Sequence, residues 1–224
     1  LLSILLGTGT GSFAAKTDFT TGLSPQSVVS QDFNADGRPD LAVGNLGSSS
    51  VSILLGTGSG SFGAKTDFTA GLNPSSVSSD DFNADGVPDL AIVSGSAPAG
   101  GVLFGTGSGD FGASISFTGG GSSVISEDFN ADGRPDLAVA GGSVVSILLA
   151  NGSGNFLSKT DFTTGSDANS VISEDFNADG RPDLATANSS SNSVSILLGT
   201  GTGSFGAKTD FATGSNPISV TGED

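Results

Sequence analysis

The sequence repeats itself with a period of 47 to 49 residues. The string Asp-Phe-Asn-Ala-Asp-Gly begins at Asp32, Asp81, Asp128 and Asp175, and a further 49 residues lead to Asp224, where the next copy would begin. A second marker, an apolar run followed by a glycine-rich turn and Phe, occurs five times, at residues 4–13, 53–62, 102–111, 147–156 and 196–205. Such a period indicates stacked units that bury their faces against one another.

The Phe residues follow the same register. Of the 15 Phe, 14 fall at three repeat positions: the end of the glycine turn, six residues later, and the second place of the Asp-Phe-Asn string. Only Phe104 lies outside these positions, where it replaces a Leu. Aromatic residues that keep the repeat register are expected to pack in the core and not to form a binding platform.

Each repeat predicts four short strands. The copy near Ser27 contains a β-prone run at 27–33, a polar loop at 34–38, strands at 39–46 and 51–56, turns at 47–50 and 57–61, and a more polar outer strand at 62–70. No segment shows a useful apolar period of 3.6 residues, which would indicate a helix. Four short strands in about 47 residues are typical of a propeller blade. We therefore expect an all-β β-propeller of four-stranded blades, as a partial ring or as about five repeats.

Each Asp-Phe-Asn string opens a loop that offers oxygen atoms at alternate positions. Side-chain oxygens stand at positions 1, 3, 5 and 9, Gly at position 6 permits a sharp turn, and position 7 would contribute its backbone carbonyl. Ca²⁺ takes about six to eight oxygen ligands, which suits this set. About four Ca²⁺ ions are expected, one in each loop. The expected ligands are Asp32, Asn34, Asp36, Arg38, Asp40, Asp81, Asn83, Asp85, Val87, Asp89, Asp128, Asn130, Asp132, Arg134, Asp136, Asp175, Asn177, Asp179, Arg181 and Asp183.

Two other interpretations of the loop are open to the same residues. One is a turn rich in Asp and Asn that holds no metal, but three close carboxylates repel one another unless a cation intervenes. The other is an EF-hand, which requires Glu at position 12. That position holds Val43, Ile92, Val139 and Thr186, and no flanking helices are expected. Val87 in place of Arg at position 7 spares every side-chain ligand, as a carbonyl ligand would allow.

Composition argues against several classes of function. The chain has only seven Lys and Arg against 23 Asp and Glu, so the net charge of −16 argues against nucleic-acid binding, which needs clustered cations. No apolar run approaches the roughly 20 residues of a membrane-spanning helix. His and Cys are absent, and no base is set beside any Ser or Thr, so an enzyme is not expected. Asn151 and Asn188 stand in formal glycosylation sequons.

The strings DFNADGRPDLAV at 32–43 and SVSILLGTGSGSFGAKTDF at 50–68 resemble the FG-GAP repeat, or VCBS repeat, of bacterial surface proteins and of integrin α-subunit propellers. Phe-Gly is literal at Phe62, Phe111 and Phe205 and altered at Phe13 and Phe156. The Gly-Ala-Pro element is not clearly present, which favours the bacterial branch. The resemblance covers essentially the whole chain. It implies a propeller, usually seven-bladed, with the loop joining the first and second strands of each blade, in an extracellular or cell-surface protein.

Two functions are therefore expected to compete. The first is a Ca²⁺-stabilised structural or adhesive module that assembles with like copies. The second is a Ca²⁺-dependent, lectin-like propeller that binds a carbohydrate or a protein ligand. Residues 1–224 are expected to form a single array of about 4.75 repeats, truncated within a blade at both ends. Further blades outside the chain, a five-bladed ring with a missing segment, or pairing with a neighbouring copy would each complete the broken blade.

Overall fold

The computed structural model describes residues 1–70, 73–95 and 99–222 of the chain. Almost all regular structure in these residues is β-strand, apart from a 3₁₀ helix, Leu46–Ser48. None of the described helices is long and apolar enough to cross a membrane. The all-β expectation is confirmed, whereas the expected start of a further loop at Asp224 lies outside the described residues.

Within the described residues, four antiparallel sheets follow one another, each with its four strands side by side in chain order. We name them blades A to D. Blade A consists of β3 (Pro25–Gln31), β4 (Asp40–Asn45), β5 (Ser50–Leu54) and β8 (Thr66–Thr69), and blade B of β9 (Pro74–Asp80), β10 (Asp89–Ser94), β11 (Ala99–Gly105) and β12 (Phe111–Thr118). Blade C consists of β13 (Ser123–Glu127), β14 (Asp136–Gly141), β15 (Val144–Leu148) and β16 (Thr160–Thr163), and blade D of β17 (Ala168–Glu174), β18 (Asp183–Asn188), β19 (Ser193–Leu197) and β20 (Thr209–Ala212).

Two smaller pairs of strands accompany the blades. The pair β1 (Leu2–Ile4) and β2 (Thr17–Phe19) corresponds by sequence to the third and fourth strands of a blade, and we call it the half-blade. The hairpin β6 (Gly56–Gly58) and β7 (Ser61–Phe62) lies in the glycine turn of blade A. Because Phe62 pairs with Gly56 in this hairpin, the fourth strand of blade A begins at Thr66 and not at 62. The expected turn at 47–50 instead overlaps the 3₁₀ helix.

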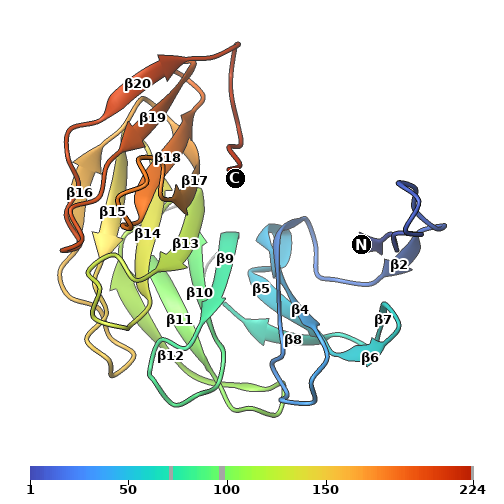
Figure 1. Cartoon of the computed structure of the whole chain (residues 1–224). Helices are drawn as coiled ribbons and strands as arrows, with labels where there is room; N and C mark the ends of the chain where they lie inside the picture. Colours follow the sequence, from blue (N-terminus) through green and yellow to red (C-terminus); the bar gives the residue numbers. More distant parts are fainter. Residues whose placement is uncertain (71–72, 96–98, 223–224) are drawn as a thin grey trace.

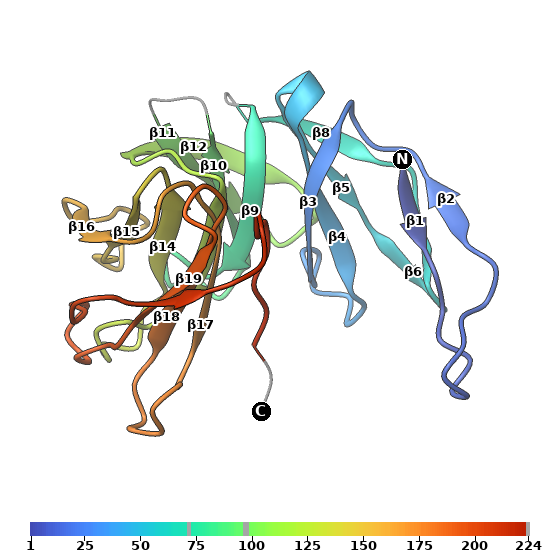
Figure 2. The same cartoon turned by 90° about the horizontal axis from the view of Figure 1, so that it is seen from above.

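The blades succeed one another around an arc, with the half-blade at one end and the C-terminal segment at the other (Figures 1 and 2). The first strands of neighbouring blades touch at one repeated contact, in which a Val backbone N–H donates to a Ser Oγ of the preceding blade. The contacts join Val77 to Ser27 at 3.2 Å, Val124 to Ser76 at 3.2 Å, Val171 to Ser123 at 3.3 Å and Val220 to Ser170 at 3.4 Å. The segment around Val220 therefore lies where the first strand of the next blade would begin.

The core lies between blades and not within one sheet. The third strand of blade A buries Val51 and Ile53, which pack in one cluster with Leu90 and Ile92 of blade B. Both faces of a central strand are thus covered by neighbouring sheets, which explains its continuous apolar sequence. Repeated four-stranded blades arranged around an arc and packed face to face are a β-propeller arrangement, as the sequence predicted.

Aromatic sets hold consecutive blades together. In each set, the Phe of the Asp-Phe-Asn loop and the Phe of the fourth strand contact the Phe that closes the glycine turn of the next blade. Phe205 of blade D meets Phe129 and Phe162 of blade C edge to face, with ring centroids 5.7 and 5.3 Å apart. The equivalent sets are Phe33, Phe68 and Phe111, and Phe82, Phe117 and Phe156. Edge-to-face packing is a favoured geometry for aromatic rings.

Candidate metal centre

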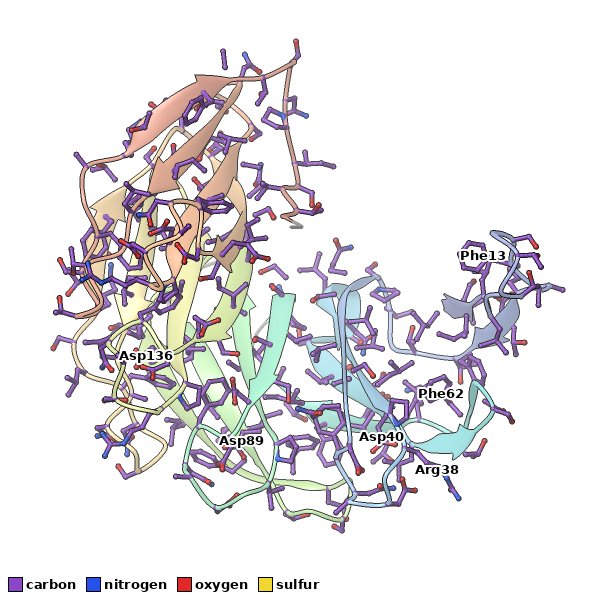
Figure 3. All side chains as sticks on the ribbon, viewed as in Figure 1. Phe13, Arg38, Asp40, Phe62, Asp89 and Asp136 are labelled. Atoms are coloured by element: carbon purple, nitrogen blue, oxygen red, sulfur yellow. The ribbon has the colours of Figure 1, made fainter. Side chains whose placement is uncertain are left out.

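The Asp-Phe-Asn loops each connect the first and second strands of a blade, as the family resemblance implied. The last expected ligands of the first three loops, Asp40, Asp89 and Asp136, lie in successive blades along the arc (Figure 3). Each of them is the first residue of its second strand. The repeat thus presents the same loop once in every complete blade of the described part of the chain.

The side chains at loop positions 1 and 3 turn around one backbone N–H group. In the first loop, Asp32 Oδ1 and Asn34 Oδ1 both accept from the Asp36 N–H at 3.1 Å, and Asp32 Oδ2 accepts from the Gly37 N–H at 2.8 Å. In the other three loops the corresponding distances lie between 2.7 and 3.1 Å. Two oxygen atoms that share one donor at about 3 Å are necessarily close to each other.

Left-handed backbone at positions 4 and 6 produces this curl. Position 6 is Gly in all four loops, with φ between 79° and 84°. Position 4 is Ala, with φ between 57° and 61°, a conformation that residues other than Gly, Asn and Asp rarely adopt. The cost of each strained Ala is of order 1–3 kcal/mol and persists only where the surroundings impose it. The backbone conformation of the loop is therefore imposed by the structure around it.

Positions 5 and 7 are paired with each other. Asp36 Oδ1 accepts from the Arg38 N–H at 2.9 Å, and Arg38 Nη1 lies 3.6 Å from Asp36 Oδ2. The same ion pair measures 3.4 Å in the third loop and 3.9 Å in the fourth. Val87 removes it from the second loop, where only the backbone bond to Asp85 is kept. The sequence pattern did not predict this use of the Arg side chain, because position 7 was assigned only a carbonyl role.

The carboxylate at position 9 is buried and bonded to backbone. Asp40 is 0 % exposed, and its two oxygens accept from the Phe33 N–H at 2.9 Å and the Gly56 N–H at 2.6 Å. Asp89, Asp136 and Asp183 repeat both bonds, with the second donor being Gly105, Ala150 and Gly199. The sequence pattern missed these donors, although each directly follows an apolar run. Position 9 therefore ties the loop to the end of the third strand.

At two of the position-9 residues, burial raises the pKa of the carboxyl group. Burial raises the pKa of Asp89 to about 6, against the lowering effect of the Gly105 and Phe82 N–H groups, and the charges of Asp85 and Asp81 raise it further. Burial likewise raises the pKa of Asp136 to about 6, with Asp132 and Asp128 adding to the effect. At position 1 of the fourth loop, the Gly180 N–H lowers the pKa of Asp175. The carboxylates of Asp89 and Asp136 thus sense the negative charges at positions 1 and 5 of their own loops.

The loops fit Ca²⁺ in donor chemistry and in backbone conformation. Every side-chain donor is an oxygen atom, and positions 1 and 3 are already turned together, as a ligand shell requires. In the described residues, however, no group of three His, Cys, Asp or Glu side chains comes together as a metal cluster. A shell would therefore draw on the Asn oxygen and the position-7 carbonyl. Ligation by all 20 expected residues, including position 9, stays a prediction.

In metal-free protein, an Asp→Asn substitution is expected to reduce stability at position 9 of the loop but not at position 5. Asp136→Asn replaces one of two buried acceptors with an NH₂ group, which leaves a backbone N–H unpaired and should cost about 1–3 kcal/mol of unfolding free energy. Asp132→Asn keeps Oδ1 for the Arg134 N–H and should leave stability nearly unchanged. Urea denaturation in EDTA measures both, and equal losses would contradict the structural role of position 9.

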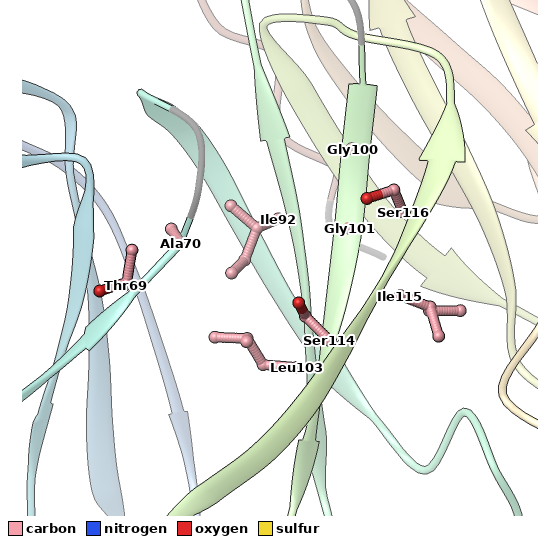
Figure 4. Close-up of a pocket in the computed structure, with 9 residues that line it drawn as sticks. All are labelled: Thr69, Ala70, Ile92, Gly100, Gly101, Leu103, Ser114, Ile115 and Ser116. Atoms are coloured by element: carbon pink, nitrogen blue, oxygen red, sulfur yellow. The ribbon is translucent and has the colours of Figure 1, made fainter.

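Blade B departs from the repeat and contains a cavity that the sequence pattern did not predict. Gly100 and Gly101 replace the Val and Ser of other third strands, and Ser114 and Ser116 replace the Lys and Asp of other fourth strands. A cavity of about 360 Å³ lies here against Thr69 and Ala70 of blade A, and Ile92 and Leu103 also line it (Figure 4). The space beside Gly100 is not empty, because a Cβ there would meet the Phe117 ring at 2.0 Å. In blade A the equivalent space holds a Ser52–Asp67 hydrogen bond of 2.6 Å and the Lys65–Asp67 ion pair.

A sequence model of the FG-GAP-like repeat matches residues 2–43, 32–92, 128–186 and 175–224, which together are most of the chain. No curated protein matches the chain.

Several solved structures share the fold at low identity. A lectin of Agrocybe aegerita, described as recognising non-reducing terminal N-acetylglucosamine, aligns with a TM-score of 0.66 and 19 % identity over 95 % of this chain and 60 % of its own. BBS1N in complex with ARL6DN aligns with a TM-score of 0.61 and 13 % identity, over 88 % of this chain and 60 % of its own. Hydrazine synthase of Kuenenia stuttgartiensis aligns with a TM-score of 0.51 and 14 % identity, over 97 % of this chain and 82 % of its own. The chain spans about 60 % of the length of the first two.

Proposed function

This chain belongs to the FG-GAP-like repeat family, and on that premise we propose that it is a Ca²⁺-stabilised structural or adhesive module of an extracellular or cell-surface protein. In this proposal each of the four loops holds one Ca²⁺ through the side chains at positions 1, 3 and 5 and the carbonyl at position 7. The proposal assigns no catalytic step to the chain. Assembly with like copies is a separate proposal that does not depend on the loops.

One observation carries the calcium proposal. In all four loops the oxygens of positions 1 and 3 converge on the same N–H group, and a strained Ala at position 4 holds them there. A bound cation would offset the negative charge that remains in these loops, where at most one Arg accompanies three Asp. The ion would join the loop to the first strand and to the base of the second strand, so the blade would be rigid where the chain is most polar.

Binding stoichiometry tests this proposal residue by residue. Isothermal titration of metal-stripped protein with CaCl₂ should show four sites, and Asp36→Ala or Asp179→Ala should each remove one, because position 5 supplies a carboxylate. Lys65→Ala on the outer strand is the control, and it should leave all sites intact and change stability by under about 0.5 kcal/mol. An undiminished site count in Asp36→Ala would show that the loop is not the calcium site.

The cavity of blade B supports a second candidate, a propeller that binds a carbohydrate or protein ligand. Its hydroxyl groups and apolar floor, with a volume of about 360 Å³, suit a small neutral ligand. The fold likeness to a lectin adds no residue to this argument. A glycan array probed with the Ca²⁺-loaded protein tests it, and Ser116→Asp, which restores the residue of the other blades, serves as the variant with a filled cavity. Binding that survives this substitution would place any ligand elsewhere.

A further inference from the structure

The glycine turn of blade C carries an Asn where the equivalent turns carry a Thr. Asn151 stands at the repeat position of Thr8, Thr57, Thr106 and Thr200. It is exposed, and it is the only Asn of the sequence that is followed by Gly. A Gly has no side chain to keep its backbone nitrogen away from the preceding side chain. The pair of Asn151 and Gly152 therefore has the composition for attack of a backbone nitrogen on a side-chain amide.

The amide oxygen of Asn151 is held by two donors of one residue. Its Oδ1 accepts hydrogen bonds from the Ser153 N–H at 3.1 Å and from the Ser153 hydroxyl at 2.7 Å. Donors placed on a carbonyl oxygen stabilise the negative charge that this oxygen gains when a nucleophile adds to its carbon. In the equivalent turn of blade D, Thr200 instead donates its Oγ1 to the Ser204 carbonyl oxygen at 2.9 Å. The paired donors of blade C therefore polarise an amide that the other turns do not contain.

The two nitrogen atoms that take part in such an attack are free. Within the part of the chain that the structure describes, neither the Gly152 N–H nor Asn151 Nδ2 donates a hydrogen bond to a protein group. The turn is closed by the Asn151 N–H, which donates to the Asn155 carbonyl oxygen at 2.9 Å, and Gly152 has a left-handed φ of 76°. A closed turn holds the attacking nitrogen and the amide together, which raises their effective concentration.

Asn188, the other sequon residue, shows the opposite arrangement. It is 0 % exposed, its Nδ2 donates to the hydroxyl groups of Ser193 and Ser195, and its Oδ1 accepts from Thr186 at 3.0 Å. Departure of this Nδ2 would break both of its hydrogen bonds, and the residue that follows is Ser189 and not Gly. The two Asn residues are thus expected to differ in reactivity although both belong to the same sequence motif.

The guanidinium group of Arg134 lies against this turn. A Cβ built on Gly152 would lie 2.6 Å from Arg134 Nε and 3.2 Å from its Cζ. The equivalent approach to Nε is 3.3 Å in blade D and 3.8 Å in blade A, and Val87 takes the place of the Arg in blade B. A positive charge at this place stabilises the anion that forms when the Gly152 nitrogen loses its proton and adds to the amide. Blade C therefore combines a polarised amide with a cation beside the attacking nitrogen.

We propose that Asn151 deamidates without an enzyme, in a reaction that Ser153 and Arg134 promote. The Gly152 nitrogen gives its proton to a hydroxide ion of the solvent and forms a bond to Asn151 Cγ. The bond from Cγ to Nδ2 then breaks, and Nδ2 leaves as ammonia with a proton from water. Water opens the resulting succinimide ring at either carbonyl carbon, so residue 151 becomes Asp or isoaspartate. The net change is the loss of ammonia and the gain of water.

The product carries a carboxylate beside the third Asp-Phe-Asn loop. Arg134 Nη1 lies 3.4 Å from Asp132 Oδ2, and a negative charge at residue 151 gives the guanidinium group a second acidic neighbour. Exposed ion pairs contribute little to stability, so blade C is expected to stay folded after the reaction. The chain thus gains one negative charge on the surface of blade C, and this reaction does not depend on calcium binding.

Incubation of the full chain at mildly alkaline pH, followed by proteolysis and tandem mass spectrometry, tests this proposal. Residue 151 should gain the mass difference between Asn and Asp, while the exposed Asn155 of the same turn and the buried Asn188 stay unchanged over the same period. Ser153→Ala removes one of the two donors to Oδ1 and should slow the reaction about fivefold, the equivalent of one hydrogen bond. Arg134→Val, which gives blade C the residue of blade B, should slow it about twofold or more.

The same incubation in urea separates an effect of the structure from an effect of the sequence. Unfolding removes the contacts of Ser153 and Arg134 with the turn, so both variants should react there at nearly the wild-type rate. Asn151→Thr, which carries the residue of the other turns, should give no product at this position and serves as the blank. A folded protein in which Asn151 stays intact, folded variants that react as fast as the wild type, or an equal slowing of the variants in urea would each overturn the proposal.

Discussion

Chelation of Ca²⁺ is expected to lower the melting temperature of the loaded protein by many degrees. The unfolded chain lacks the curled loop, so the binding free energy adds to the folding free energy. At a thousandfold excess of free Ca²⁺ over Kd, each independent site contributes roughly 4 kcal/mol. For a protein of this size, about 2–4 °C of melting temperature corresponds to each kcal/mol. Differential scanning calorimetry before and after EDTA measures the change.

The melting experiment needs a measured starting metal content and two metal additions as controls. Metal content is determined first, so that the starting protein is known to be loaded, and CaCl₂ in excess of EDTA should restore the original melting temperature. Added Mg²⁺ is the matched control, because it demands a smaller, near-octahedral shell and should restore less. An unchanged melt after EDTA in protein shown to be loaded would contradict calcium stabilisation.

Truncation of the buried loop Phe is expected to have the other large effect. Phe129 is 2 % exposed and packs between blades C and D, so Phe129→Ala should cost about 3–5 kcal/mol of unfolding free energy through lost burial and a cavity. Phe176→Ala is the matched control, because it changes the same repeat position in blade D, where the side chain is 42 % exposed. Its cost should be clearly smaller. Urea denaturation of both variants in CaCl₂ measures the difference.

One outcome would contradict this expectation for the two Phe variants. Equal losses in Phe129→Ala and Phe176→Ala under conditions where the protein is monomeric would mean that a neighbouring blade does not determine the burial of this position.

Much of the fold was predictable because it is encoded locally and repeated. The period of 47 to 49 residues, the alternation within the strands and the glycines at left-handed turns depend on short stretches of chain. The conformation of the Asp-Phe-Asn loop is also local, since positions 1, 3, 5 and 6 bond to one another within six residues. For these reasons the strands, the blades and the place of the loop followed from the pattern of residues.

The role of Asp40 could not be read from its spacing. Position 9 has the chemistry of a ligand, but its carboxylate accepts a hydrogen bond from the Gly56 N–H. Gly56 lies beside Asp40 because the third strand pairs with the second. The cavity of blade B also escaped sequence reasoning. The sequence analysis drew no conclusion from Gly101, Ser114 and Ser116, because the cavity they line is closed by Thr69 and Ala70 of blade A, which lie far away along the chain.

The sequence by itself determined the repeat, the order of its strands and the oxygen donors of its loops, because neighbours along the chain decide these features. Tertiary structure decided which copies of the same residue are covered. Phe129 and Phe176 stand in the same Glu-Asp-Phe-Asn-Ala-Asp-Gly context, yet one is buried and the other is 42 % exposed. Burial depends on the presence of a further sheet against the same face, and that sheet is formed by residues a full repeat away.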